Sequence, residues 1–260
     1  MPILVVFLAL ALFLAQPAQR TVLAPTGTLR ASFIASNPVQ GRVDAGTGAV
    51  TGPAPDLVRE LARRLGVPYE ITPLPDAGAV LESVRSGKAD IGFLAQEAER
   101  ASQVDFSDPY SNSGAAYAVR ANATFQTSAD VDRAGATIGA VSGQSPEVYL
   151  RAHVKNARVE SLPAVPANAA LGRMLFDGTF DAFGANRTRM EELVREVPGL
   201  RVLPDDYMVT SQAIVVRKGD AAGLAEINRF LADARTSGFV KTSIERAKVA
   251  GVSVAPEPRR

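Results

Sequence analysis

The sequence predicts an α/β protein of two lobes, each a mainly parallel sheet flanked by helices, with two strands that cross between the lobes. Strand and helix patterns alternate in two separate runs, residues 29–94 and 137–184. Strands separated by helices form parallel sheets that helices cover on both faces. Two apolar, β-prone segments outside these runs, residues 115–120 and 211–217, have the character of the crossing strands.

The first run begins with a strand at Leu29–Ile34 and a loop rich in Gly, Pro, Thr and Asp at 38–55. The following helix, Asp56–Leu65, places its leucines on one face and ends at Gly66. The rest of this run is predicted as a strand, a helix and a strand, at Val67–Leu74, Ala77–Arg85 and Ala89–Leu94.

The second run begins with a strand at Thr137–Val141 and a helix at Ser145–Val154, for which Ser145 is the N-cap candidate and Pro146 lies in the first turn. The last two helices of the chain are expected to pack back on the first lobe. In chain order, the remaining pattern predicts a strand at Val159–Leu162, a helix at Ala167–Phe176, a strand at Phe180–Gly184, a helix at Thr188–Val197, strands at Arg201–Leu203 and Gln212–Arg217, and helices at Gly223–Arg235 and Phe239–Lys248.

The N-terminus predicts an export signal. Residues 1–19 carry no charged side chain, and their apolar stretch, Ile3 to Ala15, is shorter than the ~20 residues that span a membrane. The usual basic start is missing, so an uncleaved anchor and a mis-assigned start stay open as alternatives. Without a cysteine there is no lipid-attachment site, and the exported chain is expected to be free in its compartment. The predicted domains are a signal peptide at 1–19, a first lobe at 24–115 plus 212–251, and a second lobe at 118–208.

Composition argues against several classes of function. The chain has 28 Lys and Arg against 27 Asp and Glu, which gives a net charge of +1. Without a basic tract, the sequence does not have the clustered positive charge that is typical of nucleic-acid-binding proteins. The absence of cysteine and the single histidine, His153, argue against thiol catalysis and zinc binding. The nearest match to a nucleophile elbow, GQSPE at 143–147, lacks the second glycine. No catalytic residue, metal or cofactor is predicted.

Seven segments are informative as an ordered set. They are GTLRASF at 27–33, PDLVRELARRLGV at 55–67, SGKADIGFLA at 86–95, AERASQVDFSDPY at 98–110, ATIGAVSGQSPEVYL at 136–150, DGTFDAF at 177–183 and SGFVKTSIERA at 237–247. Over about residues 27–251, the set resembles a divergent branch of the family 3 extracellular solute-binding proteins of bacterial ABC transporters, the polar amino-acid-binding group.

The resemblance implies a periplasmic-binding-protein type II fold with a small solute bound in the cleft between the lobes. It also implies a non-enzymatic, monomeric protein in the periplasm that delivers its ligand to an ABC-transporter permease at the inner membrane. Closure of the cleft around the ligand is the hinge motion that such proteins share.

The resemblance implies that Arg100 clamps a carboxylate of the ligand. A planar guanidinium matches a carboxylate through two parallel hydrogen bonds, which supports that role. The alternative is a structural Arg100 that pairs with Asp105 or Asp108 in the same loop. Gln96 stands where the family has hydroxyl side chains and is the candidate replacement contact, with a solvated loop glutamine as the alternative.

In the second lobe, Gly143, Gln144 and Ser145 match the family segment that offers hydroxyl and backbone N–H donors to the same carboxylate. A helix N-terminus favours anions, and the alternative is that Ser145 only caps its own helix. Asn186 stands where amino-acid binders carry the aspartate that pairs with the ligand ammonium. Since a buried ammonium without a paired charge is costly, a carboxylate without the amino group, or a modified amino acid, is favoured. Arg187 is a candidate for a second positive charge.

Asn37 and Ser113 complete the predicted contacts. Asn37 lies at residues 36–41, where the family usually has an aromatic that stacks on the ligand. A second hypothesis is enzymatic, because the same scaffold hosts a dehydratase, and Glu97 or Glu147 is then the candidate acid. A third hypothesis, a sensory input domain, is disfavoured because such domains continue into a membrane span and a signalling module.

Overall fold

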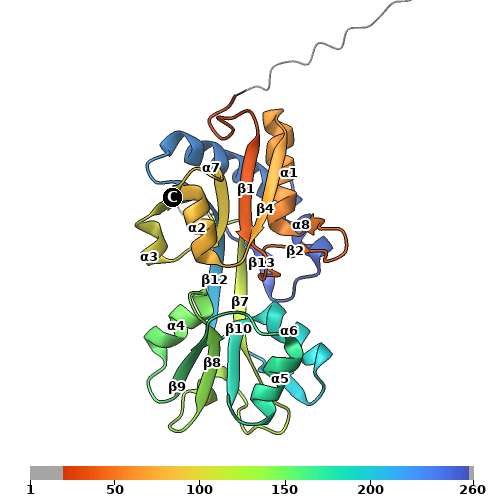
Figure 1. The fold of residues 1–260 in the computed structure, drawn as a ribbon, viewed down its shortest axis with the longest axis vertical. Coiled ribbons are helices and arrows are strands. Elements are labelled where there is room, and N and C mark those ends of the chain that lie inside the picture. Colours follow the sequence, from red (N-terminus) through yellow and green to blue (C-terminus); the bar gives the residue numbers. More distant parts are fainter. Residues whose placement is uncertain (1–19, 258–260) are drawn as a thin grey trace, which may run out of the picture.

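The computed structural model describes residues 20–257, which form two lobes joined by two long strands (Figure 1). The predicted signal peptide, residues 1–19, lies outside the described residues. The strands are β1 Leu29–Ile34, β2 Arg42–Val43, β3 Val50–Thr51, β4 Tyr69–Leu74, β5 Ile91–Ala95, β6 Val104–Phe106, β7 Ser111–Arg120, β8 Thr137–Val141, β9 Arg158–Leu162, β10 Ala182–Asn186, β11 Leu200–Val202, β12 Met208–Arg217 and β13 Val252–Val254.

Helices cover the sheet in both lobes (Figure 1). Between residues 20 and 257, none of them is both long and apolar enough to span a bilayer. The helices are α1 Pro53–Leu65, α2 Ala77–Arg85, α3 Ala98–Ala101, α4 Ser145–His153, α5 Asn168–Phe176, α6 Arg187–Glu196, α7 Ala221–Thr236 and α8 Phe239–Ala247, with a 3₁₀ turn, η1, at Ser128–Val131.

One mixed sheet runs through both lobes in the order β4-β1-β5-β12-β7-β10-β8-β9. Its two outer thirds are parallel: β1 pairs with β4 and β5, and β8 pairs with β9 and β10. The central strands β12 and β7 run antiparallel to each other and to their neighbours β5 and β10. This topology is the predicted α/β arrangement with two crossing strands, while the residue boundaries of the lobes stay a prediction.

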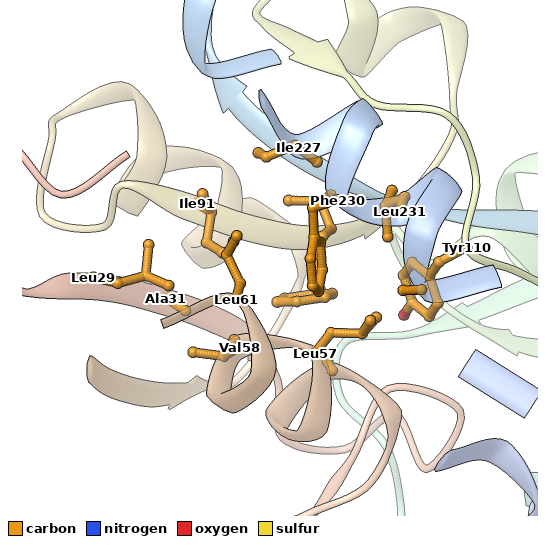
Figure 2. Packing of buried hydrophobic residues seen from close by; sticks show 14 of the residues in the cluster. Leu29, Ala31, Leu57, Val58, Leu61, Ile91, Tyr110, Ile227, Phe230 and Leu231 are labelled. Atoms are coloured by element: carbon orange, nitrogen blue, oxygen red, sulfur yellow. The ribbon is translucent and has the colours of Figure 1, made fainter. Parts of the chain in front are cut away.

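The first lobe encloses a core on each face of its sheet. On one face, Leu57 and Leu61 of α1 meet Ile227, Phe230 and Leu231 of α7 (Figure 2). Each large apolar side chain buried in this way contributes roughly 1.5–3 kcal/mol. The two C-terminal helices therefore pack on the first lobe, as the sequence predicts. The other face is covered by α2.

The second lobe packs α5 and α6 on one face and α4 on the other. Gly139 of β8 lets the rings of Phe180 and Phe183 pack against the backbone of β8, because a Cβ at this position would lie 2.7 Å from both rings. In each lobe the parallel strands run toward the other lobe, so the carboxyl ends of β1, β8 and β10 face the junction between the lobes (Figure 1).

Three local expectations need correction. Helix α1 begins at Pro53 and not at Asp56, since proline is tolerated in the first turn, where its missing N–H has no helical partner. The N-cap of α4 is Gln144, and Ser145 is already helical. The loop at 38–55 contains the β2–β3 hairpin.

Candidate ligand-binding cleft

Four chain segments meet between the lobes, each at or just after the carboxyl end of a strand from the parallel part of the sheet. Asn37 follows β1 and Arg100 follows β5 in the first lobe. Gln144 follows β8 in the second lobe, and Asn186 is the last residue of β10. In open α/β sheets, ligands bind in the crevice outside the carboxyl ends of the strands. The topology therefore brings these four side chains to the place where a ligand is expected.

Two adjoining pockets lie in this cleft, each with a cavity volume of only about 20 Å³, because side chains of the two lobes contact each other across it. Asn37, Gln144 and Asn186 line both of them. The first pocket is further lined by Ser36, Pro38, Val141, Val165, Pro166, Leu171, Phe183, Ala185 and Arg189. The second is further lined by Ile34, Gln40, Ala77, Ala95, Arg100, Ser145, Pro146 and Gln212.

Arg100 bridges the two lobes from the short helix α3. Its Nη1 donates to the carbonyl oxygen of Ala95 at 3.1 Å, and its Nη2 donates to the carbonyl oxygen of Gly143 in the second lobe at 2.9 Å. Both acceptors are neutral, so the hydrogen bonds leave the charge of the guanidinium uncompensated.

No carboxylate among residues 20–257 lies within ion-pair range of Arg100. Asp105 pairs instead with Lys218, at 2.7 Å. The structural pairing of Arg100 with Asp105 or Asp108 is therefore not observed. Burial lowers the pKa of Arg100, and the charges of Glu97 and Glu99 oppose that shift only partly. An arginine stays protonated in proteins, so the cleft contains a partly desolvated cation.

The start of helix α4 faces Arg100 across the cleft. Gln144 is its N-cap and makes no side-chain capping bond, and Ser145 is the first helical residue, which corrects the expectation that Ser145 caps the helix. The first N–H groups of a helix have no partner within it and carry the positive end of the helix dipole. Pro146 has no N–H, so Ser145 and Glu147 supply the backbone donors of this turn.

Asn37 and Asn186 contact each other across the cleft. The Nδ2 of Asn186 donates to the Oδ1 of Asn37 at 3.1 Å, and that oxygen also accepts from the N–H of Val39 at 3.2 Å. Asn186 is buried and is the N-cap of α6. The lobes are thus closed far enough for side chains from both to bond directly.

Two predicted contacts, Gln96 and Ser113, line neither pocket. Gln96 is exposed, and its Nε2 donates to the carbonyl oxygen of Ser107 at 3.0 Å. Ser113 is buried between β7 and β12, where its hydroxyl accepts from the Nε2 of Gln212 at 3.4 Å. Of these residues, only Gln212 lines a pocket.

The sequence reasoning missed two buried glutamines, Gln40 and Gln212. The Nε2 of Gln40 donates to the Oε1 of Gln212 at 3.2 Å and to the carbonyl oxygen of Phe93 at 3.1 Å, and its Oε1 accepts from the N–H of Ile34 at 2.9 Å. Both side chains are at most 1% exposed and line the second pocket. No local signal marks them, because Gln40 lies in an irregular loop and Gln212 in a crossing strand.

Arg189 of α6 lines the first pocket and was also not predicted as a site residue. Arg187, the predicted second positive charge, does not serve there, because its Nε donates to Asp206 at 2.6 Å. Residues two positions apart on a helix point in directions about 200° apart. Arg187 and Arg189 therefore lie on opposite faces of α6, and only Arg189 lines the cleft. Burial lowers the pKa of Arg189.

The match to known proteins covers most of the chain. Residues 33–246 match the model of the bacterial extracellular solute-binding proteins, family 3. The chain belongs to this family. The description of the family gives its members as extracellular and solute-binding.

Several relatives of this solute-binding protein are amino-acid binders by name. It is 26% identical to the L-cystine-binding protein TcyJ of Escherichia coli K12 over 204 residues, which cover 76% of this chain and 74% of TcyJ. It is similar to the amino acid ABC transporter substrate-binding protein AbpA of Streptococcus pneumoniae bound to L-arginine, with a TM-score of 0.72, 26% identity, and coverage of 85% and 94%. An ancestral amino-acid-binding protein described as a precursor of cyclohexadienyl dehydratase has a TM-score of 0.72, 23% identity and coverage of 86% and 96%, and shares the fold.

The acids considered for catalysis do not line either pocket. The Glu147 carboxylate accepts hydrogen bonds from Ser161 at 2.6 Å, from Arg151 and from the N–H of Gly143. Burial acts to raise the pKa of Glu147, but these hydrogen bonds outweigh it and hold the pKa below its ordinary value. This carboxylate is therefore ionised near neutral pH and unsuited to donate a proton. Glu97 begins α3 as its N-cap.

Proposed function

We propose that this family 3 solute-binding protein captures a small carboxylate-bearing solute in its interlobe cleft in the periplasm and delivers it to an ABC-transporter permease. The observation that carries this proposal is Arg100, a partly desolvated guanidinium with no carboxylate partner among residues 20–257. The ligands in the names of two relatives, L-cystine and L-arginine, both carry carboxylates.

In this proposal, the two lobes hold one carboxylate from opposite sides. Arg100 supplies a charged, bidentate donor from the first lobe, and the start of α4 at Gln144 and Ser145 supplies hydroxyl and backbone donors from the second. Asn37 and Asn186 exchange their mutual hydrogen bond for contacts with the ligand. Because cleft closure excludes water, each of these interactions is stronger than it would be at the surface.

Gln96 and Ser113 are proposed to act from behind this lining. Ser113 bonds to Gln212 and orients its amide toward the second pocket, and Gln96 fixes the chain beside Ser107 at the end of β5. The protein is proposed to bind without turnover and as a monomer. No feature of the cleft favours the dehydratase hypothesis, since neither pocket is lined by a described acid.

A thermal-shift screen over aliphatic carboxylates, amino acids and opines tests the proposal. A ligand at ~100 times its dissociation constant stabilises the protein by about 2.7 kcal/mol, which at this chain length raises Tm by roughly 5–10 °C. Arg100→Gln is expected to abolish the shift. The matched control, Arg229→Gln, changes an exposed arginine of α7 and is expected to keep it. Shifts that occur only with compounds lacking a carboxylate, or that survive Arg100→Gln in full, would refute the proposal.

A further inference from the structure

Two adjoining pockets of the cleft are lined by two arginines and by no acid of the described chain. Acids that line neighbouring pockets include Asp76, together with Ser36 and Gln144, and Glu192, together with Ser36 and Arg189. Arg100 lines the second pocket and Arg189 lines the first, and three neutral amides, Asn37, Gln144 and Asn186, line both. The two cations therefore flank a shared polar surface. A ligand that covers this surface contacts both pockets, because they adjoin through the same three side chains.

Arg189 has neutral partners for both of its observed hydrogen bonds. Its Nη1 donates to the Oδ1 of Asn168, and its Nη2 donates to the carbonyl oxygen of Pro166 at 3.0 Å. These two bonds orient the guanidinium and leave further donors free, since arginine has five N–H donors.

Two acids act on Arg189, and each has another partner, although Glu192 lines a neighbouring pocket together with Arg189. Glu192 forms an ion pair with Arg42, and Glu196 accepts a hydrogen bond from Asn168 at 2.6 Å. Burial lowers the pKa of Arg189, and the charges of these two acids oppose that shift without cancelling it. Arg189 is thus in the same state as Arg100: a partly desolvated cation held by neutral groups.

One polar side chain of the first pocket has no hydrogen-bond partner in the described part of the chain. The hydroxyl of Ser36 is buried and makes no hydrogen bond with any residue in 20–257. Buried polar atoms without partners are rare in native proteins and call for an explanation. A donor hydroxyl beside a guanidinium is a suitable site for a second anionic group.

We propose that the ligand is a small dicarboxylate without an ammonium group, with one carboxylate at Arg100 and the α4 N-terminus and the other at Arg189 and Ser36. This inference rests on the proposed function and narrows it to a class of ligand. It explains the paired cations and the neutral amide at Asn186 together: two guanidiniums neutralise two carboxylates, and no described acid lines the two pockets to compensate an ammonium there.

Calorimetric titrations at constant ionic strength test the inference with matched probes. The probes are butyrate as monoacid, succinate, glutarate and adipate as diacids of increasing length, and L-glutamate as the ammonium-bearing form of glutarate. A charge-assisted hydrogen bond contributes about 1.5–3 kcal/mol. One diacid is therefore expected to bind about 10- to 150-fold more tightly than butyrate. L-Glutamate is expected to bind at least about tenfold more weakly than glutarate, since its ammonium finds no acid.

Two variants locate the second carboxylate. Arg189→Gln is expected to remove the preference for the best diacid over butyrate, and its thermal unfolding in the absence of ligand shows whether the variant is folded. Arg195→Gln, an exposed arginine in the last turn of the same helix, is the control and is expected to change neither affinity. Arg189→Lys keeps the charge and is expected to retain part of the preference for the diacid.

The outcomes separate this inference from the proposed function. If butyrate binds as tightly as every diacid, or if Arg189→Gln leaves the diacid affinity intact while Arg100→Gln removes it, the dicarboxylate assignment is wrong and the carboxylate-binding function stands. If L-glutamate binds more tightly than glutarate, the assignment is also wrong. If none of the carboxylates binds here or in the wider screen, the proposed function itself is overturned.

Discussion

Arg100 joins the two lobes through the guanidinium that is also proposed to hold the ligand. Its bond to the Gly143 carbonyl joins the lobes by a charged donor and a neutral acceptor. A carboxylate is the stronger acceptor, because a charge-assisted pair is roughly twice as strong as a neutral hydrogen bond. A bound carboxylate is therefore expected to displace the Gly143 carbonyl from Arg100 and to take its place between the lobes.

Asn186→Asp tests the residue that most separates this chain from amino-acid binders. The substitution adds an acid to two pockets that are lined by no described acid and removes the N–H that Asn186 donates to Asn37. We expect the ratio of L-glutamate to glutarate affinity to rise by at least about tenfold, since the ammonium gains a charged partner. Calorimetry with both compounds measures the ratio, and an unchanged ratio would show that position 186 does not face the ligand.

At the scale of elements, much of the fold follows from local pattern. β1, β8 and α2 have the predicted bounds, because apolar periodicity and glycine or aspartate boundaries coincide there. The three-residue strands β6 and β13 were not predicted. Each exists through pairing with a crossing strand, β6 with β12 and β13 with β7, which is information that a local pattern does not contain.

The candidate site was predictable only in part for a similar reason. Arg100, Gln144 and Asn186 lie at the carboxyl ends of strands, where topology and resemblance both direct attention. Arg189 lies inside a helix that carries several arginines. Which of them lines the cleft depends on which face of α6 is turned toward it. Gln40 becomes significant only through its bond to Gln212, 172 positions further along the chain. Such contacts depend on tertiary packing.

Helix α1 carries a pH-dependent contribution to stability. Hydrogen bonds from Arg63 and then Arg64, both 2.8 Å, outweigh burial and lower the pKa of Glu60 from 4.5 to about 2. A carboxylate whose pKa is depressed by folding contributes stability above its unfolded pKa and loses it as the pH falls through the folded value. The contribution is therefore complete above about pH 4.5 to 5 and disappears toward pH 2.

Glu60→Gln is expected to lower Tm at pH 7 by roughly 2–4 °C or less, because helical surface pairs contribute below about 1 kcal/mol. The difference in Tm between the wild type and Glu60→Gln should shrink as the pH is lowered from 5 to 2. Differential scanning calorimetry across this range measures it. A difference of the same size at pH 2.5 and pH 7 would contradict the assigned direction of the shift.

At the scale of the whole molecule, one sheet continues through both lobes by way of β7 and β12. Closure is then supported by contacts between lobes and not by a shared core, since the buried clusters of the two lobes are separate. Arg42 of β2 and Glu192 of α6 form an ion pair at the edge of the cleft, and Arg100 and the Asn37–Asn186 bond join the lobes inside it.

Glu192→Gln is expected to weaken binding of a ligand found in the screen only slightly, by less than about fivefold. The side chain of Arg42 is 48% exposed, and exposed pairs contribute below about 1 kcal/mol. In 1 M salt, where the Debye length is about 3 Å, the difference from the wild type should disappear. Calorimetry at low and high salt measures it, with Glu226→Gln of α7 as the control. A loss above tenfold that persists in 1 M salt would show a direct role in ligand contact.

The most direct test of carboxylate capture is native mass spectrometry of the protein incubated with a defined equimolar pool of butyrate, succinate, glutarate, adipate, L-glutamate, L-arginine and L-cystine. We predict a 1:1 adduct with a diacid in the wild type and in Arg229→Gln, and its loss in Arg100→Gln. An adduct that persists undiminished in Arg100→Gln, or a protein that retains no member of the pool, would contradict the central claim that Arg100 holds a carboxylate between the lobes.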